Sequence, residues 1–440
     1  MIPIFCPPSQ IRWSELVEHD EVVRRYREFF ALFDWTQVTE RNGQRPWPGR
    51  TPHPRSAYVK ALLVRIAEEK TFMTDLRAYL IDHPLLVLDL GFRPVPDPSA
   101  LFGFDVERTV PCVGWLCTQL RTLDEAMVGQ MLKATVRALQ AEIANLGETV
   151  AFDVKHIYAW VQENNPKAFI AHRFDPLRQP AGDPDCRLGI KRRSNQKGAD
   201  GESIGPTEYV WGYGTGIASA TADRYGDVVL AELTQTFNEN DATYFAPLYE
   251  QVRATLGHRP TNITADAAFD AWRIYDTCVA TGGIPAIPLN LRGHPPVQRT
   301  PEGIPLCTKH LAMTPASSFI HEDGYRAQYF SCPLLHPSRT ALTCSHPRFA
   351  TGGCLHKINL EEGGKLRVAL DRTTPAFHAI YDQRTSAERI NSQATALGIE
   401  RPKVRNYRSI RHLNTLTYLV INARALRRAR NINATQLGAA

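Results

Sequence analysis

One short stretch, from Tyr381 to Glu388, carries a phenol, a guanidinium and a carboxylate at helical spacing. Tyr381, Arg384 and Glu388 fall at positions i, i+3 and i+7, which lie on one face of a helix. The pattern fits an ordinary surface ion pair between Arg384 and Glu388. It equally fits the last ligand of a metal site, with the arginine meeting phosphate, if carboxylates upstream lie on strands.

Two aspartates upstream meet that condition. Asp153 lies in the β-prone run Thr149–Val154, and Asp266 ends a second such run, Thr261–Asp266. Mg²⁺ prefers carboxylate oxygens and keeps positions open for phosphate. Two such ions can activate a water or a 3′-hydroxyl and stabilise the leaving oxygen of a phosphoryl transfer. Aspartates at strand ends are also common caps, so spacing alone leaves both interpretations open.

Several nearby residues have a simpler structural interpretation. We expect His156 to be a structural histidine and Asp270 to cap the helix that follows it. Trp160 and Trp211 are large enough to stack on an unpaired base, but we expect both to pack in the core. Arg384 is better suited to orienting Glu388 or a phosphate than to a surface pair alone, because its planar fork can do both.

The nine cysteines are scattered and contain no C-x-x-C pair, a pattern typical of reduced thiols. Four of them have histidines nearby but lack the short spacing of zinc knuckles. We expect reduced, partly buried thiols there, and structural Zn²⁺ is the alternative. These four are Cys307, Cys332, Cys344 and Cys354.

The composition describes a folded globular chain. Its 440 residues are 43% hydrophobic and 22% charged, enough for two or three domains. No apolar run has membrane length and no secretory signal opens the chain, so we expect a cytoplasmic protein. The net charge of +6 is concentrated after residue 400, where nine Lys or Arg and no acid occur. Such a tail indicates either a phosphate-facing surface or a solvated basic helix.

The elements that must position these residues change in character along the chain. Residues 1–148 are predicted to be mostly helical, and 291–370 read as an insertion because they are rich in Pro, Gly and His. We expect a long irregular loop over 164–203. The other predicted strands are 209–218, 227–233, 261–266 and 284–289, and the other predicted helices are 238–256, 271–280, 377–396 and 410–428.

With these residues in view, the chain resembles the DDE-type insertion-sequence transposases. The segment around Asp153 is similar to the family's first catalytic strand. Ile263–Asp270 is similar to its second acidic block, which places the second aspartate at Asp266. Tyr381-x-x-Arg384-x-x-x-Glu388 matches the Tyr-Arg-Glu signature of one branch. That signature continues with a lysine seven residues after the glutamate, where this chain has Thr395.

The resemblance implies a mixed α+β fold. It consists of a helical N-terminal domain (1–148) for DNA binding and dimerisation, and a ribonuclease-H-like catalytic domain (149–290 and 371–440). The catalytic domain holds a five-stranded mixed sheet, interrupted by the insertion at 291–370. Asp153, Asp266 and Glu388 would be the catalytic residues and the ligands of two Mg²⁺ or Mn²⁺ ions. The expected supporting or DNA-binding residues are Tyr381, Arg384, Arg389, Lys403, Arg405, Arg408 and Arg411.

The activity implied by the resemblance is DNA transposition. The protein would cleave transposon ends and transfer the freed strands into target DNA. Its partners would be double-stranded DNA, as terminal inverted repeats and target, and a second copy of the chain when active. Its place would be the prokaryotic cytoplasm, at the nucleoid. A divalent-metal nuclease without strand transfer and a domesticated, non-catalytic DNA-binding protein are the alternatives.

Overall fold

The computed structural model describes residues 13–40, 51–191, 207–291 and 297–437. The chain divides into two compact units, each described here by itself: unit 1 is Met1–His258 with Thr385–Ala440, and unit 2 is Arg259–Arg384. Both units contain helices and sheets, which confirms the predicted mixed α/β architecture. The predicted three-part division at residues 148, 290 and 370, and the ribonuclease-H arrangement, stay predictions.

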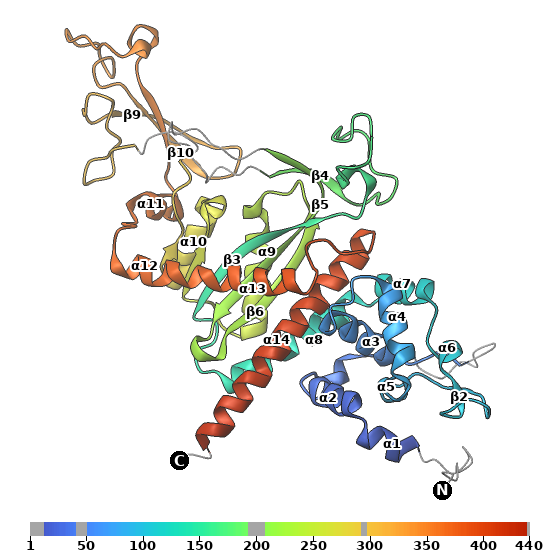
Figure 1. The fold of residues 1–440 in the computed structure, drawn as a ribbon. Helices are drawn as coiled ribbons and strands as arrows, with labels where there is room; N and C mark the ends of the chain where they lie inside the picture. Colours follow the sequence, from blue (N-terminus) through green and yellow to red (C-terminus); the bar gives the residue numbers. More distant parts are fainter. Residues whose placement is uncertain (1–12, 41–50, 192–206, 292–296, 438–440) are drawn as a thin grey trace. The chain divides into compact units, whose positions relative to one another are not determined.

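An antiparallel sheet forms the centre of unit 1 (Figure 1). Its long strand β5 (Glu208–Thr221) pairs along one edge with β3 (Thr149–Tyr158). Its other edge is shared, because β4 (Arg187–Lys191) pairs with the first residues of β5 and β6 (Asp227–Thr236) pairs with the rest. The β-branched and aromatic residues of β3, β5 and β6 explain why these strands were predictable.

The two faces of the sheet are covered by different helices. Gly214 and Gly216 of β5 leave room for Tyr244 of α9 (Asp241–Leu256), since a Cβ at either glycine would lie 2.4 Å from that side chain. Thr215 points to the opposite face, where its hydroxyl meets that of Tyr418 on α14 (Tyr407–Leu437). On the same face as Thr215, Ser219 and Ser386 of α13 (Thr385–Ala396) share a 3.0 Å hydrogen bond.

Helix α14 is buried on nearly every side from residue 412 to residue 426. It packs against β6, α3 (Arg55–Ala67), α7 (Val113–Arg121) and α8 (Glu125–Glu142). Its polar side chains find partners inside the unit; Asn422, for example, bonds the backbone of Val229 in both directions. The arginines of this helix that stay exposed, among them Arg408, Arg427 and Arg428, lie toward its two ends.

The N-terminal helices share one hydrophobic core with the sheet and α14. Residues 13–30 form two helices and not one, because Asp20 accepts a 2.8 Å hydrogen bond from the backbone N–H of Val23 and so caps the second. The remaining elements of this region are α1 (Trp13–His19), α2 (Glu21–Phe30), α4 (Met73–Asp82), α5 (Pro84–Leu90), β1 (Val95–Pro96), β2 (Phe104–Asp105) and α6 (Val106–Thr109).

Unit 2 contains a parallel strand pair and a separate antiparallel sheet. The parallel pair is β7 (Asn262–Ala265) with β8 (Pro285–Ala286), shorter than the predicted strand over 284–289. The antiparallel sheet, in the order β11-β10-β9, lies within the predicted insertion. Its strands are β9 (Thr314–Ile320), β10 (Arg326–Ser331) and β11 (Leu355–Asn359), and the helices of unit 2 are α10 (Trp272–Thr281), α11 (Glu362–Ala369) and α12 (Pro375–Tyr381).

Short 3₁₀ turns connect many of these elements. They are η2 (Trp35–Gln37), η3 (Gln162–Asn164), η4 (Asp223–Tyr225), η5 (Ala267–Phe269), η6 (Pro347–Thr351) and η7 (Asp382–Arg384). Within the described ranges, the helices are either too short or too polar to cross a membrane.

Candidate active site

Asp153 lies in the middle of β3, directly opposite Ile217 of β5. Directly paired residues of antiparallel strands point to the same face, so Asp153 faces the side of the sheet that α13 covers. The side-chain amide of Asn391, on α13, donates a 2.8 Å hydrogen bond to Asp153 Oδ2. The carboxylate is partly buried and is held in place from the helix.

Glu388 lies in the first turn of α13, three residues before Asn391. Residues at i and i+3 are neighbours on a helix, with Cβ atoms about 5–6 Å apart. The exposed Glu388 carboxylate therefore stands beside the amide that holds Asp153. Ser386 and Ala387 are fully buried and fix this turn against the sheet. Two of the three predicted acidic residues thus come from facing elements of unit 1.

The third predicted acid, Asp266, belongs to unit 2. It follows β7, is partly exposed and accepts a 2.8 Å hydrogen bond from the backbone N–H of Ala268. Asp270, four residues later, is instead saturated: Arg367 binds it through two nitrogens and the Tyr275 hydroxyl donates to it. The expectation that Asp270 caps the following helix is wrong, since α10 has no side-chain cap.

The Tyr381–Glu388 stretch is not one regular helix. Tyr381 ends α12, Arg384 ends the 3₁₀ turn η7, and Glu388 lies in α13. A 3₁₀ turn has three residues per turn instead of 3.6, so it changes the angular relation of the residues on either side of it. The Arg384 guanidinium lies 5.6 Å from the centre of the Tyr381 ring. A role for Arg384 in orienting Glu388 stays a prediction.

Two of the arginines predicted to bind DNA form ion pairs inside unit 1. Arg389 binds the buried carboxylate of Asp227, at the start of β6, through two hydrogen bonds of 2.7 Å. These bonds raise the pKa of Arg389 above its ordinary value. Arg411 binds Glu125 of α8 at 2.6 Å. The first pair ties α13 to β6 and the second ties α14 to α8, whereas Arg408 is exposed.

The cations that follow α13 lie on aromatic rings. Lys403 and Arg405 are 5.7 and 4.8 Å from the centre of the Trp160 ring. The expectation that Trp160 is a core residue is wrong, because 38% of it is exposed. The same expectation is confirmed for Trp211, which is 1% exposed.

Carboxylate oxygens are suitable ligands for Mg²⁺ or Mn²⁺, and Asp153 and Glu388 supply them from facing elements. Within the ranges that the structure describes, no three His, Cys, Asp or Glu side chains gather closely enough to hold a metal ion. The four cysteines considered for Zn²⁺ are free thiols. Two of them are buried and two partly buried: Cys307 and Cys332, and Cys344 and Cys354. Burial raises the pKa of the Cys354 thiol.

Comparison with protein families gives one match, which covers more than half of the chain. Residues 190–423 match the model of the transposase DDE domain. The chain belongs to this family. The matched segment includes Asp266 and Glu388 and begins after Asp153. No curated protein matches the chain. As a member of the DDE transposases, the protein is an enzyme that acts on DNA.

Sequence reasoning missed Asn391 and Asp227. Asn391 had a usable signal, because it lies one helical turn after Glu388 on the same face. Asp227 had no such signal, because the pattern of an aspartate directly after Tyr225-Gly226 is typical of an ordinary turn residue. Only the folded chain brings it to Arg389, 162 residues away.

Proposed function

We propose that this protein is a DNA transposase that cleaves double-stranded DNA at transposon ends and joins the freed 3′ ends to target DNA. The observation that carries the proposal is the bond between Asn391 and Asp153, which ties the strand of one acid to the helix of another, Glu388. Membership of the DDE family supplies the substrate class. Two protomers would act together, because two ends must be joined.

Asp153, Asp266 and Glu388 are the proposed ligands of two Mg²⁺ or Mn²⁺ ions, which when bound would promote attack by water or a 3′-hydroxyl and stabilise the leaving oxygen. Asn391 fixes the orientation of the Asp153 carboxylate. Ser386 and Arg389 hold the first turn of α13 against β5 and β6, so Glu388 projects from a rigid support. Such positioning is most of what a protein contributes to phosphoryl transfer.

Cleavage of the natural DNA ends tests the proposal. A duplex made from the DNA that flanks the reading frame would be incubated with protein and Mg²⁺ or Mn²⁺. Asp153→Asn, Asp266→Asn and Glu388→Gln should each abolish cleavage but leave binding of the duplex intact. Glu250→Gln is the matched control, because Glu250 is an exposed acid of α9 that pairs with Arg253 of the same helix.

The products distinguish the remaining functions. Joined products on a substrate with two ends identify a transposase, and cleavage without joining identifies a nuclease. Binding without cleavage by the wild type identifies a non-catalytic DNA-binding protein. Cleavage at the wild-type rate by any one of the three variants would contradict the assignment of the acidic residues.

A further inference from the structure

The segment that links α13 to α14 displays three cations in a row. From Arg401 to Arg405, positive and apolar residues alternate. Pro402 and Val404 are buried, Arg401 and Arg405 are exposed, and Lys403 is partly exposed. The buried Pro402 and Val404 anchor the segment, so the three cations beside them turn outward. The segment therefore presents a short row of positive charges.

This segment is held in place on its N-terminal side, by contacts of α13 and β3. After α13 the chain turns at Gly398, which has a φ of +85°, and the N–H of Ile399 donates a hydrogen bond to the carbonyl of Ala394. The backbone N–H of Tyr158, the last residue of β3, donates a 2.9 Å hydrogen bond to the carbonyl of Glu400. The Glu400 carboxylate in turn pairs with Lys155 at 3.0 Å. The row of charges is thus fixed to the strand that carries Asp153.

Aromatic rings, and not acids, hold the three cations. The Arg401 guanidinium lies 4.3 Å from the centre of the Tyr158 ring, and the charged groups of Lys403 and Arg405 lie over the Trp160 ring. In the described part of the chain none of the three forms an ion pair with a carboxylate. Three cations fixed on Tyr158 and Trp160, with no acidic partner in the described ranges, are suited to an anionic ligand.

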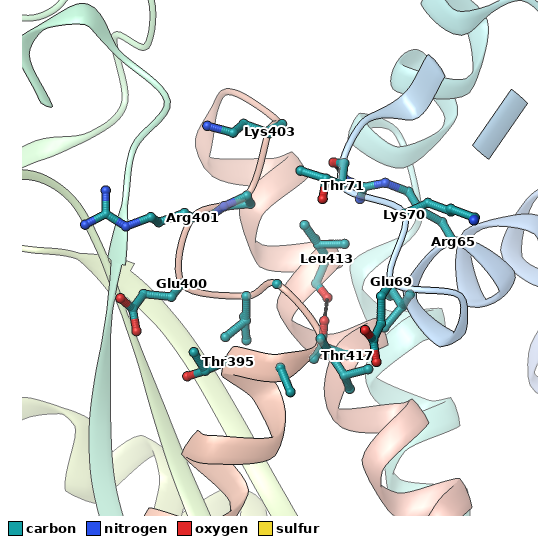
Figure 2. Close-up of a pocket in the computed structure, with 16 residues that line it drawn as sticks. Arg65, Glu69, Lys70, Thr71, Thr395, Glu400, Arg401, Lys403, Leu413 and Thr417 are labelled. Carbon is teal, nitrogen blue, oxygen red and sulfur yellow. Dashed lines mark hydrogen bonds between the residues drawn. The ribbon is translucent and has the colours of Figure 1, made fainter. Parts of the chain in front are cut away.

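Hollows lie on both sides of the segment. One, of about 320 Å³, is lined by residues 158–166 and the cationic segment. The other, of about 490 Å³, lies between the segment and the α3–α4 turn. Figure 2 shows Arg65 and Thr71 on the opposite side of it from Arg401 and Lys403, whose side chains point away from Arg65. Thr395, which replaces the lysine of the family signature, lines the second hollow.

Arg65 adds a buried positive charge to the wall of the second hollow. It is 4% exposed, and its Nη2 donates a 2.6 Å hydrogen bond to the carbonyl of Thr71, while Nε has no hydrogen-bond partner among the described residues. Burial lowers the pKa of Arg65 to about 10, so it stays charged at neutral pH. Of the two acids on this wall, Glu400 is neutralised by Lys155 and Glu69 is exposed.

We propose that the row Arg401, Lys403 and Arg405 binds the phosphodiester backbone of DNA, with Trp160 as the residue that positions Lys403 and Arg405. The row supplies the positive charge that Thr395 lacks. This inference rests on the proposed function, since it takes DNA as the substrate. It goes beyond that function by placing a backbone contact at the junction of β3, α13 and α14.

The dependence of DNA affinity on salt measures these contacts. Each phosphate contact contributes roughly 0.9 to the slope of log K against log salt for duplex DNA. The triple variant Arg401→Gln, Lys403→Gln, Arg405→Gln should therefore lower the magnitude of the slope by roughly 2.7. Each single variant should lower it by about 0.9. Arg253→Gln, which removes an exposed arginine of α9, should leave the slope unchanged.

The role of Trp160 is tested by rescue. Trp160→Leu should lower the slope by more than any single charge variant, because two cations lose their support, and Trp160→Phe should restore most of it. Trp115→Leu, at another exposed tryptophan, is the control. Thermal melting of every variant reports whether the fold is kept. If the triple variant unfolds, the salt slopes of the single variants at exposed Arg401 and Arg405 still test the proposal.

Three outcomes separate the possibilities. If the wild type does not bind DNA, the proposed function fails. If the wild type binds but the single and triple variants keep its slope, this inference alone is overturned. Inorganic phosphate, compared with chloride at equal ionic strength, should not displace DNA from the wild type; displacement would assign the site to free phosphate and overturn a DNA contact.

Discussion

Asn391 of α13 donates a 2.8 Å hydrogen bond to Asp153 of β3, and this bond joins the two halves of the acidic site in unit 1. Its partners are 238 residues apart in sequence. The bond satisfies one carboxylate oxygen with a neutral donor, so it orients Asp153 without neutralising its charge. An amide is therefore a better neighbour for a metal-binding aspartate than a lysine or arginine would be.

Asn391→Ala should weaken catalysis by loosening Asp153. Outer partners of metal ligands typically contribute 10–100-fold to metal affinity or activity. We expect the Mg²⁺ concentration for half-maximal cleavage to rise by roughly tenfold or more, with partial recovery at high Mg²⁺. A titration of cleavage rate against Mg²⁺ measures this. Gln393→Ala, also on α13, should leave the curve unchanged, and an unchanged curve for Asn391→Ala would contradict the role.

The pair of Arg389 and Asp227 should contribute to stability. Asp227 is buried and Arg389 is half exposed, so Arg389→Gln leaves a buried carboxylate without its cation. We expect a loss of about 1–3 kcal/mol, measured by urea unfolding. The double variant Arg389→Gln, Asp227→Asn should lose less free energy of unfolding than the sum of the two single losses. Both charges are removed in it, so no charge is left without its partner. Additive losses would show that the pair is not coupled.

Glu232, buried between β6 and α14, should make stability depend on pH. Burial raises its pKa from 4.5 to about 7, against smaller opposing effects of Thr415 and Arg411. The folded state then holds a proton that the unfolded state has lost between pH 4.5 and 7, so the stability contributed by this group falls as pH rises through that window and is level above it. Among the charged groups, Arg411 of α14 lowers the pKa of Glu232 and Glu125 of α8 raises it.

Glu232→Gln isolates this effect, because glutamine stays neutral at every pH. The variant should be as stable as the wild type near pH 4.5 and more stable at pH 8, by up to about 3 kcal/mol. Melting temperatures of the two proteins at both pH values provide the measurement. A difference that is the same at pH 4.5 and pH 8 would show that Glu232 does not titrate in this window.

Much of the fold was predictable where local pattern and tertiary context agree. The β-branched runs of β3, β6 and β7 and the apolar periodicity of α9 and α10 locate these elements within a few residues. Strand β4 was missed inside a predicted loop because Gly189 weakens its strand pattern. That glycine is required, since a Cβ there would lie 1.3 Å from the Phe237 ring.

The sequence pattern singled out Asp153 and Glu388, whose roles as site residues stay predictions. The residues that support them were not predictable, because Asp227 and Ser219 acquire their partners only when β5 and β6 meet α13. The basic tail shows the same limit. Its charge count indicated a phosphate-facing surface, but which arginines are engaged inside the fold depends on partners such as Glu125, far away in sequence.

Thr395→Lys should strengthen DNA binding if the cationic segment after α13 lies on the DNA. Thr395 is exposed and lines the same hollow as Arg401 and Lys403, so a lysine can be accommodated without burying its charge. One added phosphate contact should raise the magnitude of the salt slope by about 0.9. Thr395→Gln, of similar length and no charge, should leave the slope unchanged. A slope that does not rise would mean that DNA does not reach this hollow, and the contact would then be confined to the side of the segment that carries Trp160.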